Sequence, residues 1–480
     1  MFLGIDIGTS AVKAVIMGED GGIVEASAPL TVQRPEPLWS EQDPDAWWSA
    51  ANKAVLALPI ETRKKVLAIG LAGQMHGATL LDASDRPLRP AILWNDGRSE
   101  AECTELEAAE PRSREITANM AFAGFTAPKL LWVAKHEPEV FAKIASVLLP
   151  KDYVRLQMTG DKATDVSDAS GTLWLDVAKR RWSSEMLAAT GLDEGHMPRL
   201  YEGVEVTGVL RADVARSWGM HQVPVAAGGG DNAAAAVGAG VIANGDAFIS
   251  LGTSGVSFVA TDSLRSDADR GLHAFCHSIP GRWHQMAVML SAAASLDWAA
   301  NLLCMDVVEL CESARMADAR ATPIFLPYLS GERTPHADPH AKGVFFGMTA
   351  DTGPEELARS VLDGVAMGLR DGFDVIRASG SSVESFTVVG GGSRSPYWGR
   401  LIAAALDRPL VYREAGAVGP ALGAARLAQV AIGAGTLQGS CAPPPATDTV
   451  EPERDLTAYY AELQPRFRAL YTALQRSFRD

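Results

Sequence analysis

The chain has 480 residues, of which 47% are hydrophobic and 21% are charged, and its formal net charge is −15. This length exceeds what one hydrophobic core usually supports, so we expect two domains. The acidic balance, without a basic tract to neutralise phosphates, argues against nucleic acid as a partner. ATP remains compatible, because proteins bind its phosphates through backbone N–H groups and magnesium.

The five cysteines are scattered without CxxC spacing, which is typical of reduced structural thiols. The first residues, MFLGIDIGTS, indicate a strand rather than a charged leader. No apolar run approaches the roughly 20 residues that span a bilayer. These patterns predict a cytoplasmic protein that does not associate with membranes.

The first predicted element is a hairpin over residues 4–17 whose turn is Gly8-Thr9-Ser10. Its residues 5–16, IDIGTSAVKAVI, are similar to residues 249–260, ISLGTSGVSFVA, about half a chain later. Two unrelated hairpins with similar turns are the alternative. The half-chain offset favours two related domains that face each other.

Both turns have the composition of a phosphate-binding loop. Glycine lets the backbone approach an anion, and the hydroxyls and N–H groups bind its oxygens. In the second copy Ser250 and Ser257 replace Asp6 and Lys13. This asymmetry is expected if a magnesium-facing carboxylate and a phosphate-facing cation are needed only once. Neither turn is followed by a helix, which excludes a Walker-type site.

Further along the first half, a loop with the sequence GQMHG (73–77) lies between predicted strands at 66–72 and 78–81. His76 is either a packed core histidine or a neutral donor and acceptor that points into a cleft. A third strand, 91–94, ends in Asn95-Asp96-Gly97-Arg98. Asp96 and Arg98 either line the same cleft or pair with each other.

The next strand, 223–227, ends in three glycines, and Asp231 then begins an Ala-rich helix over 232–239. A carboxylate in this position is often only a helix N-cap. The functional interpretation is a base that accepts the proton of a substrate hydroxyl during phosphoryl transfer. Asn232 offers that substrate both a donor and an acceptor.

The second half continues the alternation of strands and helices, which predicts the α/β class. A helix is expected over 354–379, a strand over 385–389 and further helices over 419–432 and 455–478. The glycines after the strand would let adenosine lie against the backbone, although they do not form a GxGxxG motif. We expect an N-terminal domain over 1–242, a C-terminal domain over 243–455, and a helix over 456–480 that folds back onto the first domain.

These segments resemble the FGGY carbohydrate kinases almost from end to end. The resemblance is carried by DIGTSAVK (6–13), GFTAPKLLW (124–132), GVFFGMT (343–349) and GPALGAARLAQ (419–429). It implies two actin-like (ribonuclease H-like) domains that face each other across a nucleotide- and sugar-binding cleft. GQMHGATLLD (73–82), PAILWNDGR (90–98) and FLPYLSGERTPH (325–336) are most similar to family members that phosphorylate D-xylulose, the expected substrate.

The resemblance also implies roles for individual residues, with ATP and Mg²⁺ as cofactors. Asp231 would be the catalytic base, and Asp6 would face Mg²⁺. The sugar would contact Met75, His76, Asp231 and Asn232. The ATP phosphates would contact Thr9, Ser10, Lys13, Gly252 and Thr253, and adenosine would border Gly391, Gly392 and Ser393. The expected partners are the sugar and ATP, and a homodimer is left open.

Three alternatives compete with this interpretation. A kinase for L-ribulose, gluconate or glycerol would share the family pattern, although glycerol kinases carry Arg-Glu in place of Met75-His76. An actin- or Hsp70-like ATPase would need no base and histidine in a sugar pocket. A sugar-sensing transcription factor would need a basic DNA-binding module, which the sequence lacks.

Overall fold

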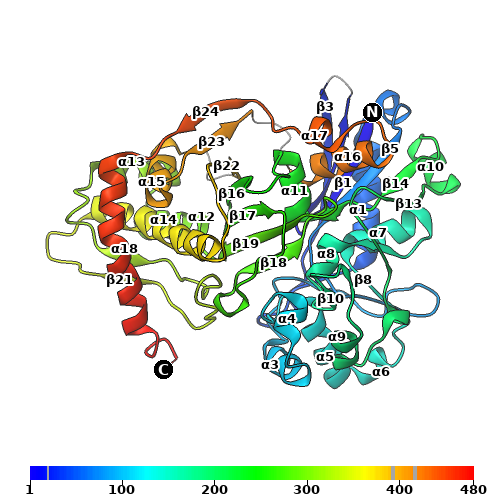
Figure 1. The fold of residues 1–480 in the computed structure, drawn as a ribbon, viewed down its shortest axis with the longest axis horizontal. Helices are drawn as coiled ribbons and strands as arrows, with labels where there is room; N and C mark the ends of the chain where they lie inside the picture. Colours follow the sequence, from blue (N-terminus) through cyan, green and yellow to red (C-terminus); the bar gives the residue numbers. More distant parts are fainter. Residues whose placement is uncertain (19–20, 391–394, 415–418, 480) are drawn as a thin grey trace.

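Two central sheets of the same topology organise the chain (Figure 1). The structure is a computed structural model that describes residues 1–18, 21–390, 395–414 and 419–479. The first sheet has the order β13 (Val206–Val209), β14 (Pro224–Ala226), β5 (Ala68–Gly73), β1 (Phe2–Ile7), β2 (Ala11–Met17) and β3 (Ile23–Pro29). The short strand β15 (Gly229–Gly230) also pairs with β5.

The second sheet repeats this order with one added edge strand. It consists of β24 (Ala446–Val450), β23 (Leu410–Arg413), β22 (Phe386–Val389), β16 (Ala247–Leu251), β17 (Gly255–Thr261), β19 (Trp283–Met289) and β18 (His273–Cys276). In both sheets the hairpin strand β1 or β16 pairs antiparallel with its partner on one side and parallel with β5 or β22 on the other. The similarity of the two Gly-Thr-Ser segments therefore reflects a repeat of whole domains. The predicted α/β class is confirmed.

Helices and short strand pairs surround these sheets. The first half contains α1 (Pro44–Ala57), α2 (Ile60–Arg63), α3 (Glu100–Ala109), α4 (Ser113–Thr117), α5 (Thr126–His136), α6 (Pro138–Phe141), α7 (Pro150–Thr159), α8 (Val166–Ser170), α9 (Ser184–Ala189), α10 (Ala212–Trp218) and α11 (Asp231–Ala239). The second half contains α12 (Ala293–Leu302), α13 (Val307–Met316), α14 (Pro354–Ala378), α15 (Pro396–Leu406), α16 (Pro420–Ala431), α17 (Leu437–Ser440) and α18 (Arg454–Leu474). The short pairs are β4 (Glu41–Gln42) with β7 (Ala91–Ile92), β6 (Thr79–Leu81) with β8 (Ser146–Leu148), β9 (Ala163–Asp165) with β12 (Arg199–Tyr201), β10 (Leu175–Asp176) with β11 (Arg181–Trp182), and β20 (Ile324–Leu326) with β21 (Val344–Phe346).

Helix α16 belongs to the second half of the sequence but packs on the first sheet (Figure 1). It lies against β1 and β5 and crosses α11. The backbones approach so closely that a Cβ atom on Gly423 would lie 1.8 Å from the carbonyl oxygen of Ala234. A Cβ on Gly4 would lie equally close, at 1.8 Å, to the carbonyl oxygen of Ala421. Only glycine allows these contacts, so the junction of the two halves depends on main-chain packing.

The chain crosses between the two sheets three times: near residues 240–246, between β23 and α16, and through residues 432–445. The first and the third crossing touch each other, since a Cβ on Gly240 would lie 2.4 Å from the Cα of Pro443.

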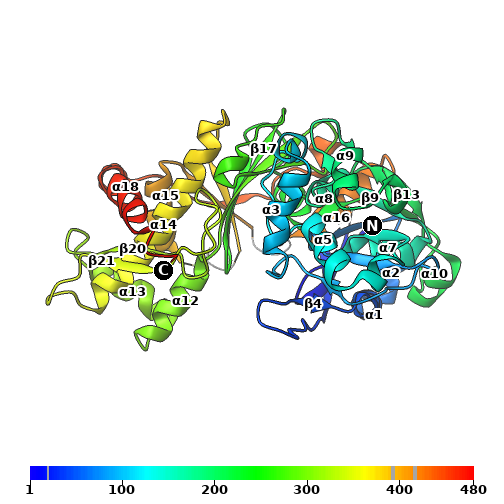
Figure 2. The same ribbon diagram turned by 90° about the horizontal axis from the view of Figure 1, so that it is seen from below.

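The prediction that the C-terminal helix folds back onto the first domain is wrong. Helix α18 packs on α14, α15 and β20 of the second domain, at the outer edge in Figures 1 and 2. Its buried Tyr460 and Phe467 belong to the second hydrophobic core, and the Tyr460 hydroxyl donates to Asp363 Oδ1 at 2.5 Å. The face of the first sheet is already covered by α16. Among the described residues, no helix has the length and apolar character needed to cross a membrane.

The glycine contact makes a testable prediction for Gly423→Ala. The added methyl group must displace the backbone of α11, so we expect the free energy of unfolding to fall by roughly 1–3 kcal/mol. Helix propensity alone would favour alanine by about 1 kcal/mol, so a loss identifies the clash as its cause. Thermal and urea unfolding measure the change. Gly419→Ala, at the N-cap of the same helix with open space around its Cβ, is the control, and equal stability of both variants would contradict the prediction.

Candidate functional site

A cavity of about 260 Å³ lies between the two domains. Met75, His76, Asp231 and Asn232 line it from the first half of the chain. Its polar lining from the second half is Ser250, Ser254, His273 and Arg333. The structure thus brings the predicted sugar loop and the predicted base together with the second Gly-Thr-Ser hairpin. These groups meet because the loops that follow β5 and β14 and the hairpin of β16 and β17 all open toward the space between the sheets.

Asp231 occupies the first turn of α11, and the N-cap is Gly230. Its Oδ1 accepts hydrogen bonds from the backbone N–H of Asn232 at 2.7 Å and from Asn232 Nδ2 at 3.0 Å. Burial raises the pKa of Asp231 to about 6, against the lowering effect of the Asn232 hydrogen bonds. The interpretation of Asp231 as only an N-cap is therefore wrong, and its carboxyl group borders the cavity.

Asp6 lies close to Asp231. Strand register places Asp6 beside Ala72, and Ala72 beside Gly229, two residues before Asp231. Burial and the charge of Asp231 raise the pKa of Asp6 to about 7, while Lys13 opposes the shift. Asp6 Oδ1 is buried and has no hydrogen-bond partner among the described residues.

The neighbouring carboxylates of Asp6 and Asp231, with the unpaired Oδ1 of Asp6, fit the binding of a divalent cation. Mg²⁺ suits this pair, because proteins usually hold it through one or two carboxylates together with substrate phosphates.

His76 has a left-handed backbone conformation, with φ of 69°. Its Nδ1 lies 2.7 Å from the carbonyl oxygen of Gly171, so Nδ1 carries the hydrogen and Nε2 is left as an acceptor. Burial above all, and the charge of Lys129, lower the pKa of His76 to about 3. The ring is neutral and its tautomer is fixed by the backbone. Met75 packs beneath the catalytic loop, since a Cβ on Gly230 would lie 3.0 Å from its Cγ and Sδ.

The first repeated turn is bound largely to its own domain. The Thr9 hydroxyl donates to Gln74 Oε1 at 2.9 Å and accepts from Trp94 Nε1 at 3.0 Å. Lys13 pairs with Glu25 at 2.6 Å, and both side chains are about half exposed. An exposed ion pair of this kind is weak, so Lys13 can exchange Glu25 for an anion at small cost. Ser10 is exposed.

In the second repeated turn the carbonyls of Gly252 and Thr253 accept from the backbone N–H groups of Ala293 and Ala292, both at 2.9 Å. These bonds fix the turn against the start of α12. The Thr253 residue is exposed. Phosphate contacts by Thr9, Ser10, Lys13, Gly252 and Thr253 stay predictions, and Gly391, Gly392 and Ser393 lie outside the described residues.

Asp96 and Arg98 pair with each other at 2.7 Å and are almost fully buried, so the structural alternative for them is correct. His273 and Arg333 are the cavity residues that sequence reasoning missed. The tract FLPYLSGERTPH contributes to the family resemblance, but nothing in it distinguishes Arg333 from the other polar residues. His273 lies in a short strand with no motif around it.

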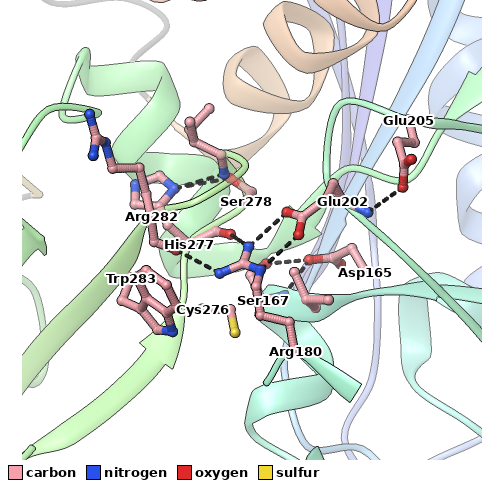
Figure 3. A network of polar contacts seen from close by, with 12 residues as sticks. Asp165, Ser167, Arg180, Glu202, Glu205, Cys276, His277, Ser278, Arg282 and Trp283 are labelled. Carbon is pink, nitrogen blue, oxygen red and sulfur yellow. Dashed lines mark hydrogen bonds and ion pairs between the residues drawn. The ribbon is translucent and has the colours of Figure 1, made fainter. Parts of the chain in front are cut away.

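A polar network joins the catalytic loop to the second domain (Figure 3). The Gly230 N–H donates to Ser167 Oγ at 3.1 Å, and Ser167 is itself bound to Asp165. Arg180 pairs with Glu202 at 2.7 Å and donates to the carbonyl oxygen of Arg282 at 2.9 Å, in the hairpin between β18 and β19. This network fixes the first-domain loop that precedes Asp231 and the second-domain hairpin that carries His273.

Beneath the network, Lys151 lies within ion-pair distance of Asp152, Asp165 and Asp168, at 2.6, 2.9 and 3.1 Å, and all four side chains are buried. Removing one member would leave an uncompensated charge in the protein interior. The cluster thus stabilises the base of the catalytic loop.

Comparison with known proteins agrees with this geometry. Residues 1–238 match the N-terminal domain, and residues 247–432 the C-terminal domain, of the FGGY family of carbohydrate kinases. Xylulose kinases from Escherichia coli (strain K12) and Klebsiella pneumoniae are 55% and 52% identical to the chain, each over 99% of both sequences.

Solved structures give the same result. A xyloylose kinase from Brucella ovis has a TM-score of 0.96 at 48% identity, with 99% of each chain covered. A xylulose kinase from Rhodospirillum rubrum has a TM-score of 0.93 at 29% identity, with 100% of each chain covered. The predicted fold of two actin-like domains is confirmed.

The environment of His76 makes a prediction about its protonation. Because burial holds its pKa at about 3, we expect His76 to stay neutral with hydrogen on Nδ1 from pH 8 down to about pH 5. An ordinary exposed histidine would become charged in that range, near its unperturbed pKa of about 6.5. Nitrogen NMR of the ring, assigned by comparison with His76→Gln, measures the tautomer and the charge. A titration of His76 near pH 6.5 would contradict the prediction.

Proposed function

Because the chain belongs to the FGGY family of carbohydrate kinases, and so is an ATP-dependent sugar kinase, we propose that it phosphorylates D-xylulose to D-xylulose 5-phosphate. The full-length identity with two xylulose kinases supports this substrate. The observation that carries the proposal is the single cavity shared by His76, Asp231 and Asn232. A neutral histidine acceptor, a carboxylate and an amide together suit the hydroxyl groups of a sugar.

In this proposal the sugar hydroxyl lies against Asp231, which accepts its proton as the γ-phosphoryl group is transferred. A carboxylate with a pKa of about 6 is ionised at neutral pH and is a stronger base than an exposed aspartate. Phosphoryl transfer through a loose transition state depends mainly on positioning, which Asn232 and Ser167 supply through their hydrogen bonds. His76 Nε2 accepts a hydrogen bond from a second hydroxyl, with Met75 beside it.

The nucleotide would lie between the repeated turns, where Thr9, Ser10, Lys13, Gly252 and Thr253 contact its phosphates and Gly391, Gly392 and Ser393 border adenosine. Asp6 would hold Mg²⁺, which neutralises charge on the phosphates when it is bound. The unpaired Asp6 Oδ1 supports this assignment. A place in cytoplasmic xylose metabolism, and domains over residues 1–242 and 243–455 with α18 packed on the second, complete the proposal. Homodimerisation is left to measurements of mass in solution.

The first test is a coupled assay of ADP release with a panel of substrates. With ATP and Mg²⁺ we expect kcat/KM for D-xylulose to exceed that for L-ribulose, gluconate and glycerol by at least about tenfold, because a site built to pair with hydroxyls rejects analogues that leave polar groups unpaired. Phosphorus NMR of the product identifies the phosphorylated carbon. A preference for another sugar would overturn the substrate and leave the kinase assignment intact.

The second test removes the proton acceptor. Asp231→Asn keeps the shape of the side chain, and we expect kcat to fall by roughly a hundredfold or more because general base catalysis is lost. Folding should be unchanged, since Gly230 is the N-cap of α11. Asp213→Asn, which changes an aspartate in the first turn of the exposed helix α10, is the matched control and should retain full activity. Normal turnover by a folded Asp231→Asn protein would show that Asp231 is not the base.

A further inference from the structure

Arg333 is a cation in the substrate cavity that has no ion-pair partner among the described residues. Its side chain lines the cavity from the second domain. Among the described residues its guanidinium group has one hydrogen-bond contact, from Nη1 to His273 Nε2 at 3.4 Å, and it lies 5.0 Å from the centre of the Phe122 ring. The neighbouring Glu332 carboxylate accepts from the backbone N–H groups of Arg333 at 2.7 Å and Leu290 at 3.0 Å. A guanidinium group has five N–H donors, so most of its donors remain for a ligand.

The position of Arg333 is fixed by its surroundings. Thr334 attaches the segment that carries Arg333 to β19 and to the turn before β18. Its N–H donates to the Val288 carbonyl at 3.0 Å, and its hydroxyl donates to the Gly271 carbonyl at 2.8 Å. Asn119 Oδ1 lies 3.3 Å from His273 Nδ1, which assigns the hydrogen to Nδ1 and makes Nε2 the acceptor for Arg333. The hairpin that continues β18 and β19 is held on the first domain by Arg180 (Figure 3).

Arg333 and Asp231 line the cavity from different domains. Arg333 lies beside His273, whose Nε2 is 3.4 Å from its Nη1, whereas Asp231 is bonded to Asn232 in α11. A row of rings connects His273 to His76, with 4.8 Å between the centres of His76 and Phe125 and 5.4 Å between those of Phe125 and His273. A sugar whose terminal hydroxyl lies at Asp231 therefore extends past His76 toward Arg333.

The polar groups that the first half of the chain contributes to the cavity are mainly acceptors. His76 Nε2 and the Asp231 carboxylate only accept, and one hydrogen of Asn232 Nδ2 is already donated to Asp231 Oδ1 at 3.0 Å. The Ser250 and Ser254 hydroxyls of the second half are neutral groups that can donate or accept. Hydroxyl groups satisfy such acceptors, but a carbonyl oxygen needs a donor. Arg333 is the strongest donor that the described part of the cavity offers.

A pentulose presents that carbonyl only in one form. Closing its ring joins C2 to the oxygen on C5, the hydroxyl that the proposed reaction phosphorylates. The reacting sugar is consequently the open chain, with a free C2 carbonyl. We propose that Arg333 donates a hydrogen bond to this carbonyl oxygen and thereby selects open-chain ketoses over polyols, an inference that rests on the proposed function.

The experiment compares D-xylulose with xylitol and D-arabinitol, the two alditols obtained by reducing C2. In Arg333→Met we expect kcat/KM for D-xylulose to fall about a hundredfold, mostly through KM, because one charge-assisted hydrogen bond is lost. For the alditols the change should stay below about threefold, since they carry no carbonyl for Arg333 to recognise. Arg333→Lys keeps the charge but loses the planar guanidinium group. Its kcat/KM for D-xylulose should therefore lie between those of the wild type and Arg333→Met.

Controls separate this role from a structural one. Arg270→Met changes an exposed arginine of the same domain, paired only with Asp267 at its surface, and should leave both substrate classes unaffected. Far-UV circular dichroism and thermal unfolding show whether Arg333→Met and Arg333→Lys are folded like the wild type. An equal decrease of kcat/KM for the ketose and the alditols in Arg333→Met would overturn the inference, and so would an unchanged kcat/KM for the ketose. Neither result would contradict the kinase activity. Wild-type protein that prefers an alditol to D-xylulose would overturn the proposed substrate and the carbonyl contact together.

Discussion

The close packing of α16 on the first sheet and on α11 is the interaction on which the rest of the structure depends. It brings a helix of the second half into main-chain contact with β1, β5 and Ala234. Strand β1 carries Asp6, and α11 begins with Asp231. The contact that joins the two halves therefore lies against both elements that carry the carboxylates at the centre of the site, whose proximity follows from the register of β1, β5 and β15.

Burial controls the protonation of the groups in the site. The raised pKa values of Asp6 and Asp231 arise mainly from burial, as those of functional carboxylates commonly do. His76 is held neutral by burial and by the nearby Lys129. The buried cluster of Lys151, Asp152, Asp165 and Asp168 lies beside Ser167, which binds the loop before Asp231. The second domain contributes Arg333 and the hydroxyls of Ser250 and Ser254 to the opposite wall.

Much of this arrangement could be predicted from the sequence, because it depends on local patterns. The Gly-Thr-Ser hairpins, the strand before Gly228 and the helix after Asp231 are defined by turn residues and apolar runs of short range. The shared cavity of His76 and Asp231 followed from the family resemblance, which places their loops at adjacent strand ends. The position of α18 could not be predicted, because an amphipathic helix specifies that one face is buried but not which surface covers it. Arg333 and His273 were missed for a related reason. Their function depends on neighbours distant in the chain, Phe122 and Asn119, and no spacing in the sequence encodes those contacts.

The contact between Gly240 and Pro443 has a mechanical consequence. It ties together two of the three segments that run between the domains, so these two segments do not move independently of each other. The hairpin of β18 and β19 is anchored to the first domain as well, because Arg180 donates to the Arg282 carbonyl oxygen and Asn119 Nδ2 donates to the Ala274 carbonyl oxygen, both at 2.9 Å. Arg333 is connected to this hairpin through the bond from the Thr334 N–H to Val288 of β19. A displacement of the two domains would therefore have to break these polar contacts before it could change the width of the cavity beside Arg333.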